Sequence, residues 1–300
     1  MLLLVWTLGA DSQWCLLLLC LIEVTSTLKY ITLSNHYRHS PKPRVIKGIS
    51  DVNNEYPFAV SLERIKPVIL GLQIFRKCTG SLIKDKWVLT AAHCLGPSLK
   101  LVRCGNMMLP RNKSRCLVKI RKKIPHPAFK LLVGESDNFL LENDVGLLLI
   151  DNVPIKTHGQ LHTADYKTFT GRACKYAGFG SIFPEIGTPK EHVQKLLINN
   201  KMLLQIGEGV VWNDNSLKKY VKPVIIVAPK PDKKHQAPNI GDSGAPLMID
   251  NRIVGVYSIS DKMRKNHTNY SFFTPISPYL DFIRNITNSP DSYLNQLAVP

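Results

Sequence analysis

The sequence predicts an all-β protein. Apolar residues come in short runs of strand length, at residues 58–62, 87–89, 145–150, 224–228 and 253–257. Turn residues separate these runs, a pattern that is typical of strands joined by loops. Residues 278–284 instead have the apolar spacing of one short helix near the C-terminal end. A chain of 300 residues is long enough for one large domain or two lobes with a sizeable core.

The N-terminal segment predicts export from the cell. Residues 1–6 and 14–22 are apolar runs, and the small residues Thr25-Ser26-Thr27 follow as a cleavage region. We therefore expect a signal peptide over residues 1–27 and a secreted protein. A signal anchor that uses both runs, and so tethers the chain to a membrane, is the alternative. Residues 28–44 are polar, hold two prolines near their end and predict an exposed linker.

The chain is strongly basic, with 39 Lys and Arg against 22 Asp and Glu and a formal net charge of +17. Residues 111–123 form a dense basic run, and further lysines follow at Lys218, Lys219, Lys222, Lys230, Lys233 and Lys234. This charge predicts an acidic partner, such as an anionic heparin-like glycan, an anionic membrane or an acidic protein. A role in solubility alone is the alternative. The sequence lacks nucleic-acid motifs, metal-ligand spacings and phosphate-binding loops, so we expect no nucleic acid, metal or cofactor.

The segment Gly241-Asp242-Ser243-Gly244 places a serine in a tight glycine turn beside a carboxylate. A serine hydroxyl is a poor nucleophile unless a base lies next to it. His93, at the end of an apolar run, and Asp144, at the start of another, supply a candidate base and a group to orient it. Each of the three is commonly a structural residue when it occurs alone. Together, in the order His, Asp, Ser, they predict nucleophilic catalysis.

These motifs resemble those of the trypsin-like (chymotrypsin-fold) serine protease family, and the resemblance extends from about residue 45 to 286. It implies two six-stranded antiparallel β-barrels with the active site in the cleft between them, followed by a short C-terminal helix. The protease domain would span residues 45–288, with the boundary between barrels near residues 155–165. Residues 289–300 would form a loose tail.

The resemblance also assigns roles to single residues. Ser243 would attack the scissile carbonyl of a protein or peptide substrate, His93 would take its proton, and Asp144 would orient the imidazole. The backbone amides of Gly241 and Ser243 would form the oxyanion hole. Ser258 matches the serine that, in this family, hydrogen-bonds the catalytic aspartate.

The start of the protease-like region predicts a zymogen. Arg44 precedes Val45-Ile46-Lys47-Gly48, which resembles the family's activation site. A trypsin-like protease would cut after Arg44, and the new amine of Val45 would pair with Asp242. A basic, proline-containing linker without processing is the alternative.

Five cysteines follow the predicted signal peptide, an odd number that leaves at least one thiol free or paired with another chain. The resemblance pairs Cys78 with Cys94. Cys104 and Cys116 have no family equivalent, but a disulfide between them would close a hairpin loop. Cys174 is the expected odd thiol, since Ile249 stands near its family partner's position. Four sequons fit a secreted glycoprotein, at Asn112, Asn266, Asn269 and Asn285.

The predicted substrate pocket departs from the family pattern. Asn239 replaces a cysteine whose disulfide normally braces the pocket. Ala237 would form the pocket floor, and Ser260 and Ser271 would narrow its walls. These residues predict a small or medium apolar residue before the scissile bond. The alternative function is a catalytically weak or inactive homologue that acts as a binding module through its basic surface.

Overall fold

The computed structural model describes residues 45, 48–68, 71–105, 113–114, 116–133, 139–180, 204–233, 236–239, 241–260 and 270–290. All of them belong to one compact unit, which comprises Pro43–Ile182 and Leu196–Pro300. A second unit, Met1–Lys42 with Phe183–Lys195, lies outside the described residues. So do the predicted signal peptide, the linker with Arg44, and three of the sequons, at Asn112, Asn266 and Asn269.

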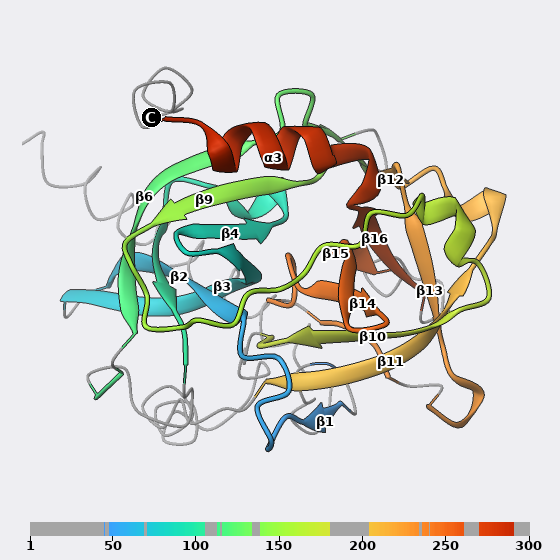
Figure 1. Cartoon of the computed structure of the whole chain (residues 1–300), viewed down its shortest axis with the longest axis horizontal. Coiled ribbons are helices and arrows are strands. Elements are labelled where there is room, and N and C mark those ends of the chain that lie inside the picture. Colours follow the sequence, from blue (N-terminus) through green and yellow to red (C-terminus); the bar gives the residue numbers. More distant parts are fainter. Residues whose placement is uncertain are drawn as a thin grey trace, which may run out of the picture. The chain divides into compact units, whose positions relative to one another are not determined.

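The first half of the described chain forms a closed, antiparallel six-stranded barrel. Its strands, in order around the barrel, are β2 (Ala59–Val68), β3 (Gly71–Lys84), β4 (Trp87–Thr90), β9 (Gly146–Ile150), β6 (Leu117–Pro125) and β5 (Leu99–Arg103). Figure 1 shows most of these strands on the left. Leucines from five of them are completely buried, and they fill the interior: Leu62, Leu82, Leu89, Leu99, Leu147 and Leu148. Closure leaves no unpaired edge in this barrel.

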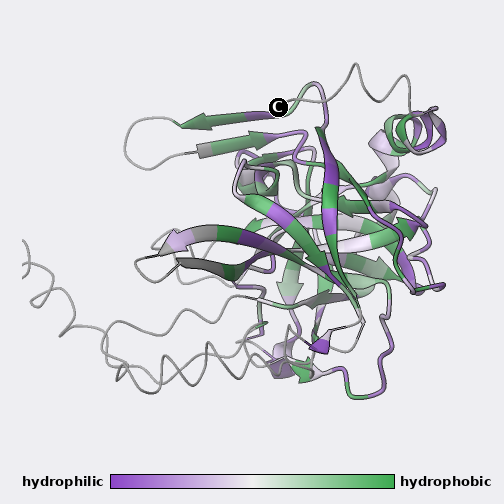
Figure 2. Ribbon diagram, turned by 90° about the vertical axis from the view of Figure 1, so that its left-hand side faces the viewer, coloured by the Kyte–Doolittle hydropathy of each residue, from purple (hydrophilic) through white to green (hydrophobic). Residues whose placement is uncertain are grey.

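The second half forms a second ring of six antiparallel strands. Its order is β10 (Ala173–Gly178), β14 (Pro246–Ile249), β15 (Arg252–Ser260), β16 (Ser271–Pro275), β13 (Ile225–Pro229) and β11 (Gln205–Trp212). β11 pairs with both β13 and β10, which closes the ring, and β1 (Ile49–Ser50) extends it. Figure 2 shows long apolar stretches on the strands of both barrels. The prediction of two six-stranded antiparallel barrels is confirmed.

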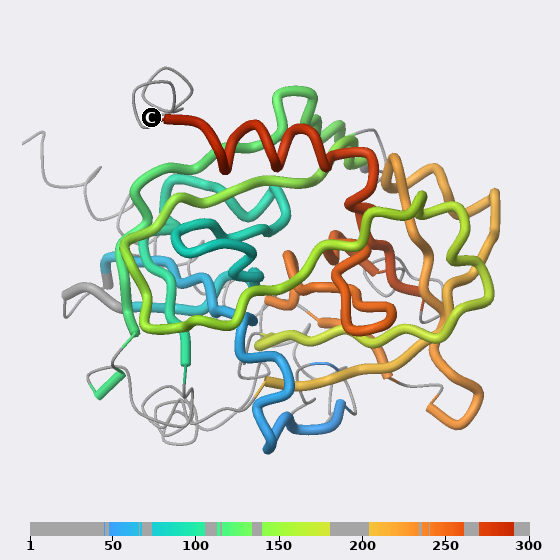
Figure 3. Tube along the Cα trace, in the orientation of Figure 1, coloured from blue at the N-terminus to red at the C-terminus, as the bar shows by residue number. Residues whose placement is uncertain are grey.

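The connection between the barrels runs from the end of β9 at Ile150 to the start of β10 at Ala173. Figure 3 lets the reader follow this yellow-green segment from one barrel to the other. It contains one 3-10 helix, η3 (Tyr166–Phe169). The predicted boundary near residues 155–165 lies within this connection and stays a prediction.

A short helix, α3 (Leu280–Asn288), follows the second barrel, as predicted, after a 3-10 turn, η7 (Ser277–Tyr279). Its apolar residues Ile283 and Ile286 join the core cluster that includes the leucines of the first barrel. The Nζ of Lys84, at the end of β3, donates to the carbonyl of Thr287 at 3.1 Å. A cation at a helix C-terminus stabilises its unpaired carbonyls. No described helix has both the length and the apolar character needed to cross a bilayer.

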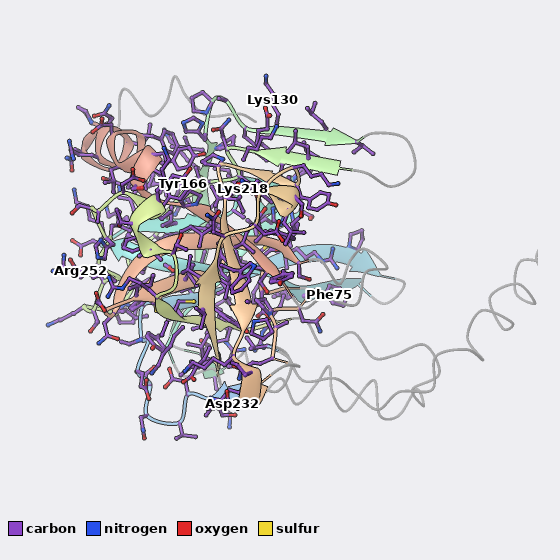
Figure 4. All side chains as sticks on the ribbon, turned by 90° about the vertical axis from the view of Figure 1, so that its right-hand side faces the viewer. Phe75, Lys130, Tyr166, Lys218, Asp232 and Arg252 are labelled. Atoms are coloured by element: carbon purple, nitrogen blue, oxygen red, sulfur yellow. A yellow bond between two sulfur atoms is a disulfide. The ribbon has the colours of Figure 1, made fainter. Side chains whose placement is uncertain are left out.

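A small third sheet was not predicted. It joins β12 (Val221–Lys222), β8 (Phe139–Glu142) and β7 (Lys130–Val133), and β12 runs parallel to β8. β12 comes from the second half of the chain and β8 from the first, so this sheet ties the two halves together. Figure 4 labels Lys130, where β7 begins, on a hairpin at the edge of the molecule. The other 3-10 helices that lie wholly within the described residues are η1 (Ala92–Cys94), η4 (Asn215–Leu217) and η5 (Pro231–Lys233).

Two disulfides join the expected cysteines, Cys78 to Cys94 and Cys104 to Cys116. The first links β3 to η1, and the second closes a loop of the kind that the chain-entropy account values at about 3 kcal/mol. Cys174 is free and buried, and burial raises the pKa of its thiol to about 12. Its sulfur is therefore protonated and unreactive at neutral pH.

Candidate active site

His93 lies in η1, and two independent links hold that short helix in place. The disulfide from Cys94 ties it to β3. The backbone amide of His93 donates to Oδ1 of Asp144 at 2.9 Å, while its ring Nδ1 lies 2.8 Å from Oδ2 of the same carboxylate. One carboxylate therefore fixes both the backbone and the ring of His93. This arrangement leaves Nε2 as the ring nitrogen that faces away from Asp144.

Asp144 is completely buried at the start of the apolar run that forms β9. Ser258 Oγ, on β15 of the other barrel, donates to Oδ2 of Asp144 at 2.5 Å. Burial alone would raise the pKa of Asp144, but the charge and hydrogen bonds of His93, together with Ser258, hold that pKa below its ordinary value of 3.8. Asp144 is thus an anion at neutral pH that three hydrogen bonds orient.

Asn143 positions Asp144, and the sequence analysis did not identify it. Its backbone is left-handed, with φ at 53°, a conformation that asparagine tolerates better than most residues. Its side-chain Nδ2 donates to the carbonyl of Ala128 at 2.8 Å, and its Oδ1 accepts from the hydroxyl of Tyr279 at 2.9 Å. Its backbone amide donates to the carbonyl of Lys222 in β12. These contacts come from three separate parts of the chain, so no local motif shows them.

The Ser243 turn is clamped between the two barrels. Thr79 N, on β3, donates to the carbonyl of Ser243 at 2.8 Å, and Thr79 Oγ1 donates to the carbonyl of Gly241 at 3.2 Å. On the other side, Gly244 N donates to the carbonyl of Tyr257 in β15 at 2.8 Å. Gly241 and Gly244 have φ of 90° and 83°, which glycine adopts at little cost. A Cβ at Gly244 would also collide with the carbonyl of Thr79.

His93 and Ser243 line the same cavity, which has a volume of about 610 Å³. Within the part of the chain that the structure describes, Ser243 Oγ makes no hydrogen bond to His93. The backbone amides of Gly241 and Ser243 likewise donate to none of the described residues. Such amides are available to an anionic oxygen, and hydrogen bonds between catalytic groups are often long before substrate binds.

Asp242 and Val45 are both completely buried in the second barrel. Gly180 N donates to Oδ1 of Asp242 at 2.7 Å, and Asn239 N donates to Oδ2 at 2.8 Å. Val45 packs in the apolar cluster that contains Tyr176 and Tyr257. Burial raises the pKa of both tyrosines, and the charge of Asp242 raises it further. The two predicted partners therefore share one region of the interior.

The predicted pocket residues differ in their position. Ser260 lines the cavity beside Asn239, whereas Ala237 and Ser271 are buried and do not contribute to its described lining. Ser271 pairs with Ser260 across β15 and β16. Leu131 and Leu141 also line the cavity, although sequence analysis did not assign them there. Their strands, β7 and β8, belong to the unpredicted third sheet.

Two further positions bear on the sequence predictions. Asn285, the one sequon asparagine among the described residues, is exposed on α3. Cys78, Cys94 and His93 bring three potential metal-ligand atoms together. The two sulfurs are bonded to each other, however, so they offer no thiolates to a metal.

Comparison with known proteins gives four matches. The Trypsin family model matches residues 45–283. Granzyme F of Mus musculus is 29% identical over 187 residues, which cover 60% of this chain and 68% of that protein. Granzyme M of Rattus norvegicus is 28% identical over 252 residues, which cover 81% and 89%. A solved structure of HL collagenase superposes with a TM-score of 0.60 at 22% identity, covering 82% of this chain and 99% of that one, a likeness of fold.

Proposed function

The chain belongs to the trypsin family of serine proteases, and on that premise we propose that it is a serine endopeptidase that hydrolyses protein or peptide substrates. One observation carries this proposal. His93 and Ser258, from different barrels, both bind the buried carboxylate of Asp144, and the ring of His93 opens onto the cavity that Ser243 also lines. A buried carboxylate that orients a histidine beside a serine turn is the arrangement that activates a serine hydroxyl.

The proposed reaction proceeds in two halves. In the first, Ser243 Oγ attacks the scissile carbonyl carbon while His93 Nε2 takes the hydroxyl proton. Asp144 stabilises the charged imidazole, and the amides of Gly241 and Ser243 bind the oxyanion. His93 then gives its proton to the leaving amine as the peptide bond breaks. In the second half, water repeats the attack on the acyl-enzyme and restores Ser243.

We also propose activation by cleavage after Arg44. A trypsin-like protease would free the amine of Val45, which would then pair with Asp242. The burial of both residues supports this pairing, because a charged pair inside the barrel forms only with good geometry. Asp242 also binds the amide of Asn239, two residues before Gly241. Ordering its carboxylate would therefore order the oxyanion hole.

The proposed substrate carries a small or medium apolar residue before the scissile bond. Ser260 narrows the cavity wall, and Leu131 and Leu141 add apolar lining. No acidic side chain lines the described part of this cavity, so it offers no ion pair to an Arg or Lys of the substrate. A cleavage profile dominated by Arg or Lys at that position would refute this substrate preference.

We also propose that the protein is secreted after residues 1–27 are removed.

The second candidate is a catalytically weak homologue that binds partners through its basic surface. The observation in its favour is that Ser243 Oγ has no hydrogen bond to His93 among the described residues. One experiment separates the two candidates. The chain is prepared with Val45 as its first residue, and separately with residues 28–44 attached, and both are treated with a fluorophosphonate probe.

The endopeptidase predicts rapid labelling of the form that starts at Val45, slow labelling of the longer form, and none of the Ser243→Ala variant. Hydrolysis of a peptide library by the first form would confirm turnover. Absence of labelling, in a sample whose N-terminus is verified as Val45, would favour the binding module.

A further inference from the structure

Four cations lie on four strands of the first barrel: Arg64 on β2, Lys77 on β3, Lys100 on β5 and Lys123 on β6. We call them the basic cluster. Burial lowers the pKa of Lys77, and the charges of Lys123 and Arg64 lower it further. Burial and the charge of Lys100 likewise lower the pKa of Lys123. Lys123 and Arg64 thus repel the charge of Lys77, and Lys100 repels that of Lys123.

Two members of the basic cluster are fixed relative to His93. Lys77 Nζ donates to the carbonyl of Cys94 at 2.6 Å, and Lys123 Nζ donates to the carbonyl of Gly96 at 3.0 Å. Both carbonyls belong to the turn that directly follows His93. An ammonium carries three donors, so each lysine keeps two for another acceptor. The turn thus presents two positioned cations beside the candidate general base.

The basic cluster has no ion-pair partner in the described part of the chain. In the ranges that the structure describes, none of its four members forms an ion pair with a carboxylate. Arg64 instead stacks on the ring of Phe75, labelled in Figure 4, at 5.8 Å from its centroid. Elsewhere, Lys230 and Lys233 both bind Glu208, at 2.7 and 2.9 Å. Among the described residues, the basic cluster therefore has no carboxylate partner to offset its charge, whereas Lys230 and Lys233 share Glu208.

Lys77 connects this potential to the reaction site. It lines the catalytic cavity with His93 and Ser243, and it is the one Lys or Arg in the cavity's described lining. The Ser243 turn is bonded to β3 through Thr79 on one flank and to β15 through Tyr257 on the other. The proposed pocket for the residue before the scissile bond lies on the β15 flank. The leaving-group side of the substrate therefore extends along the β3 flank, toward Lys77.

We infer that Lys77 is a specificity-determining residue that selects acidic side chains one or two positions after the scissile bond, with the rest of the basic cluster supplying attractive potential. This inference rests on the proposed endopeptidase function. An acidic side chain at that point would take the free donors of Lys77 and relieve the repulsion within the cluster. The substrates would then be segments with an apolar residue before the cleavage point and an acidic residue after it.

Matched peptides test this inference. They differ only in carrying Glu, Gln or Lys at the first or second position after the scissile bond, and hydrolysis is measured with the chain that starts at Val45. We expect the Glu peptide to exceed the Gln peptide in kcat/KM by about fivefold at low salt, the upper end of what a half-exposed ion pair supplies. The preference should fall as salt is added, because ions screen exposed pairs.

Two variants complete the design. Lys77→Gln keeps a donor for the Cys94 carbonyl but removes the charge, so it should bring the ratio of kcat/KM for the Glu and Gln peptides close to one. The matched control is Lys218→Gln, which removes the same charge from an exposed lysine. Figure 4 labels Lys218 at a different place from Phe75, the residue that contacts Arg64 of the basic cluster. This control should leave the preference intact. An unchanged Glu-to-Gln ratio in a Lys77→Gln protein that the fluorophosphonate still labels would overturn the inference.

A peptide-binding measurement distinguishes failure of this inference from failure of the proposed function. If the wild-type chain is neither labelled nor able to hydrolyse any peptide, the endopeptidase proposal fails, and the same peptides are then titrated onto Ser243→Ala. Tighter binding of the Glu peptide, lost in Ser243→Ala with Lys77→Gln, would still support acidic selection by Lys77. Equal binding of the Glu and Gln peptides would overturn it.

Discussion

Replacing Ser258 by alanine tests how Asp144 is held. The change removes the hydrogen bond from Ser258 Oγ to Oδ2 of Asp144, a bond of 2.5 Å to a completely buried carboxylate. The backbone and ring of His93 remain as its partners. A hydrogen bond to a charged group contributes about 1.5–3 kcal/mol, and burial excludes water as a replacement. We expect the free energy of unfolding to fall by about 2 kcal/mol at pH 7.

The pH dependence of this loss identifies its origin. The folded pKa of Asp144 lies below 3.8, so its ionic interactions stabilise the protein above that pH and are lost as the pH falls through the folded pKa. Ser258→Ala weakens only the charged form. The difference in the free energy of unfolding between variant and wild type should therefore be complete at neutral pH. It should shrink as the pH falls below 3.8. Losing the bond from Ser258 should also raise the folded pKa of Asp144, because that bond favours the charged carboxylate.

Urea unfolding measures this difference, with Ser243→Ala in every protein to prevent self-digestion. The matched control is Thr274→Val, since Thr274 Oγ1 is buried on the neighbouring strand β16 and has no hydrogen-bond partner among the described residues. Removing that hydroxyl should be neutral or stabilising at every pH. A loss below about 0.5 kcal/mol for Ser258→Ala, the size of an ordinary surface change, would show that the bond to Asp144 is not what Ser258 contributes. A loss that keeps its full size once Asp144 is protonated would show the same.

Three further predictions concern the same site. Asp144→Asn should keep the fold but lower kcat by about 10⁴, because the wrong tautomer of His93 would face Ser243; circular dichroism and peptide hydrolysis check both parts, and a loss below tenfold would contradict the assigned role. Gly244→Ala should cost about 3 kcal/mol or more, because φ is 83° and the methyl group meets the Thr79 carbonyl; a melting temperature within a degree of wild type would refute this. Asn143→Ala should cost about 2 kcal/mol in urea unfolding and Tyr279→Phe about 1 kcal/mol, since the first loses two side-chain hydrogen bonds and the second loses one. Equal losses would contradict this account of Asn143.

The fold and the position of His93, Asp144 and Ser243 in the chain were predictable because each depends on a short local pattern. Apolar runs between turns predicted strands, and the glycines around Ser243 predicted a tight turn whose φ values are indeed positive. The motifs also matched a family whose topology is known. The disulfide between Cys104 and Cys116 was predictable from spacing alone, because a loop of this length is easily closed.

Other features depend on contacts between distant segments, which no local pattern records. The clamp on the Ser243 turn uses Thr79, 164 positions away in the chain, through a backbone amide that any residue other than proline could supply. The parallel pairing of β12 with β8 brings Leu141 to the cavity wall, although Leu141 has the sequence environment of an ordinary core leucine. The basic cluster was also hidden, because Arg64, Lys77, Lys100 and Lys123 are spread over 60 residues. The predicted basic run, residues 111–123, contains only Lys123 of these four.

Locating the site of covalent modification tests the central claim, that Ser243 is a nucleophile activated by His93 and Asp144. The chain that starts at Val45 is treated with a fluorophosphonate, digested and analysed by mass spectrometry, beside His93→Ala. The account predicts a single adduct on the Ser243 hydroxyl that forms at least a thousandfold faster than in His93→Ala, in line with the roughly 10³–10⁶-fold losses that follow removal of a triad member. An adduct on another residue, or equal rates in the two proteins, would contradict it.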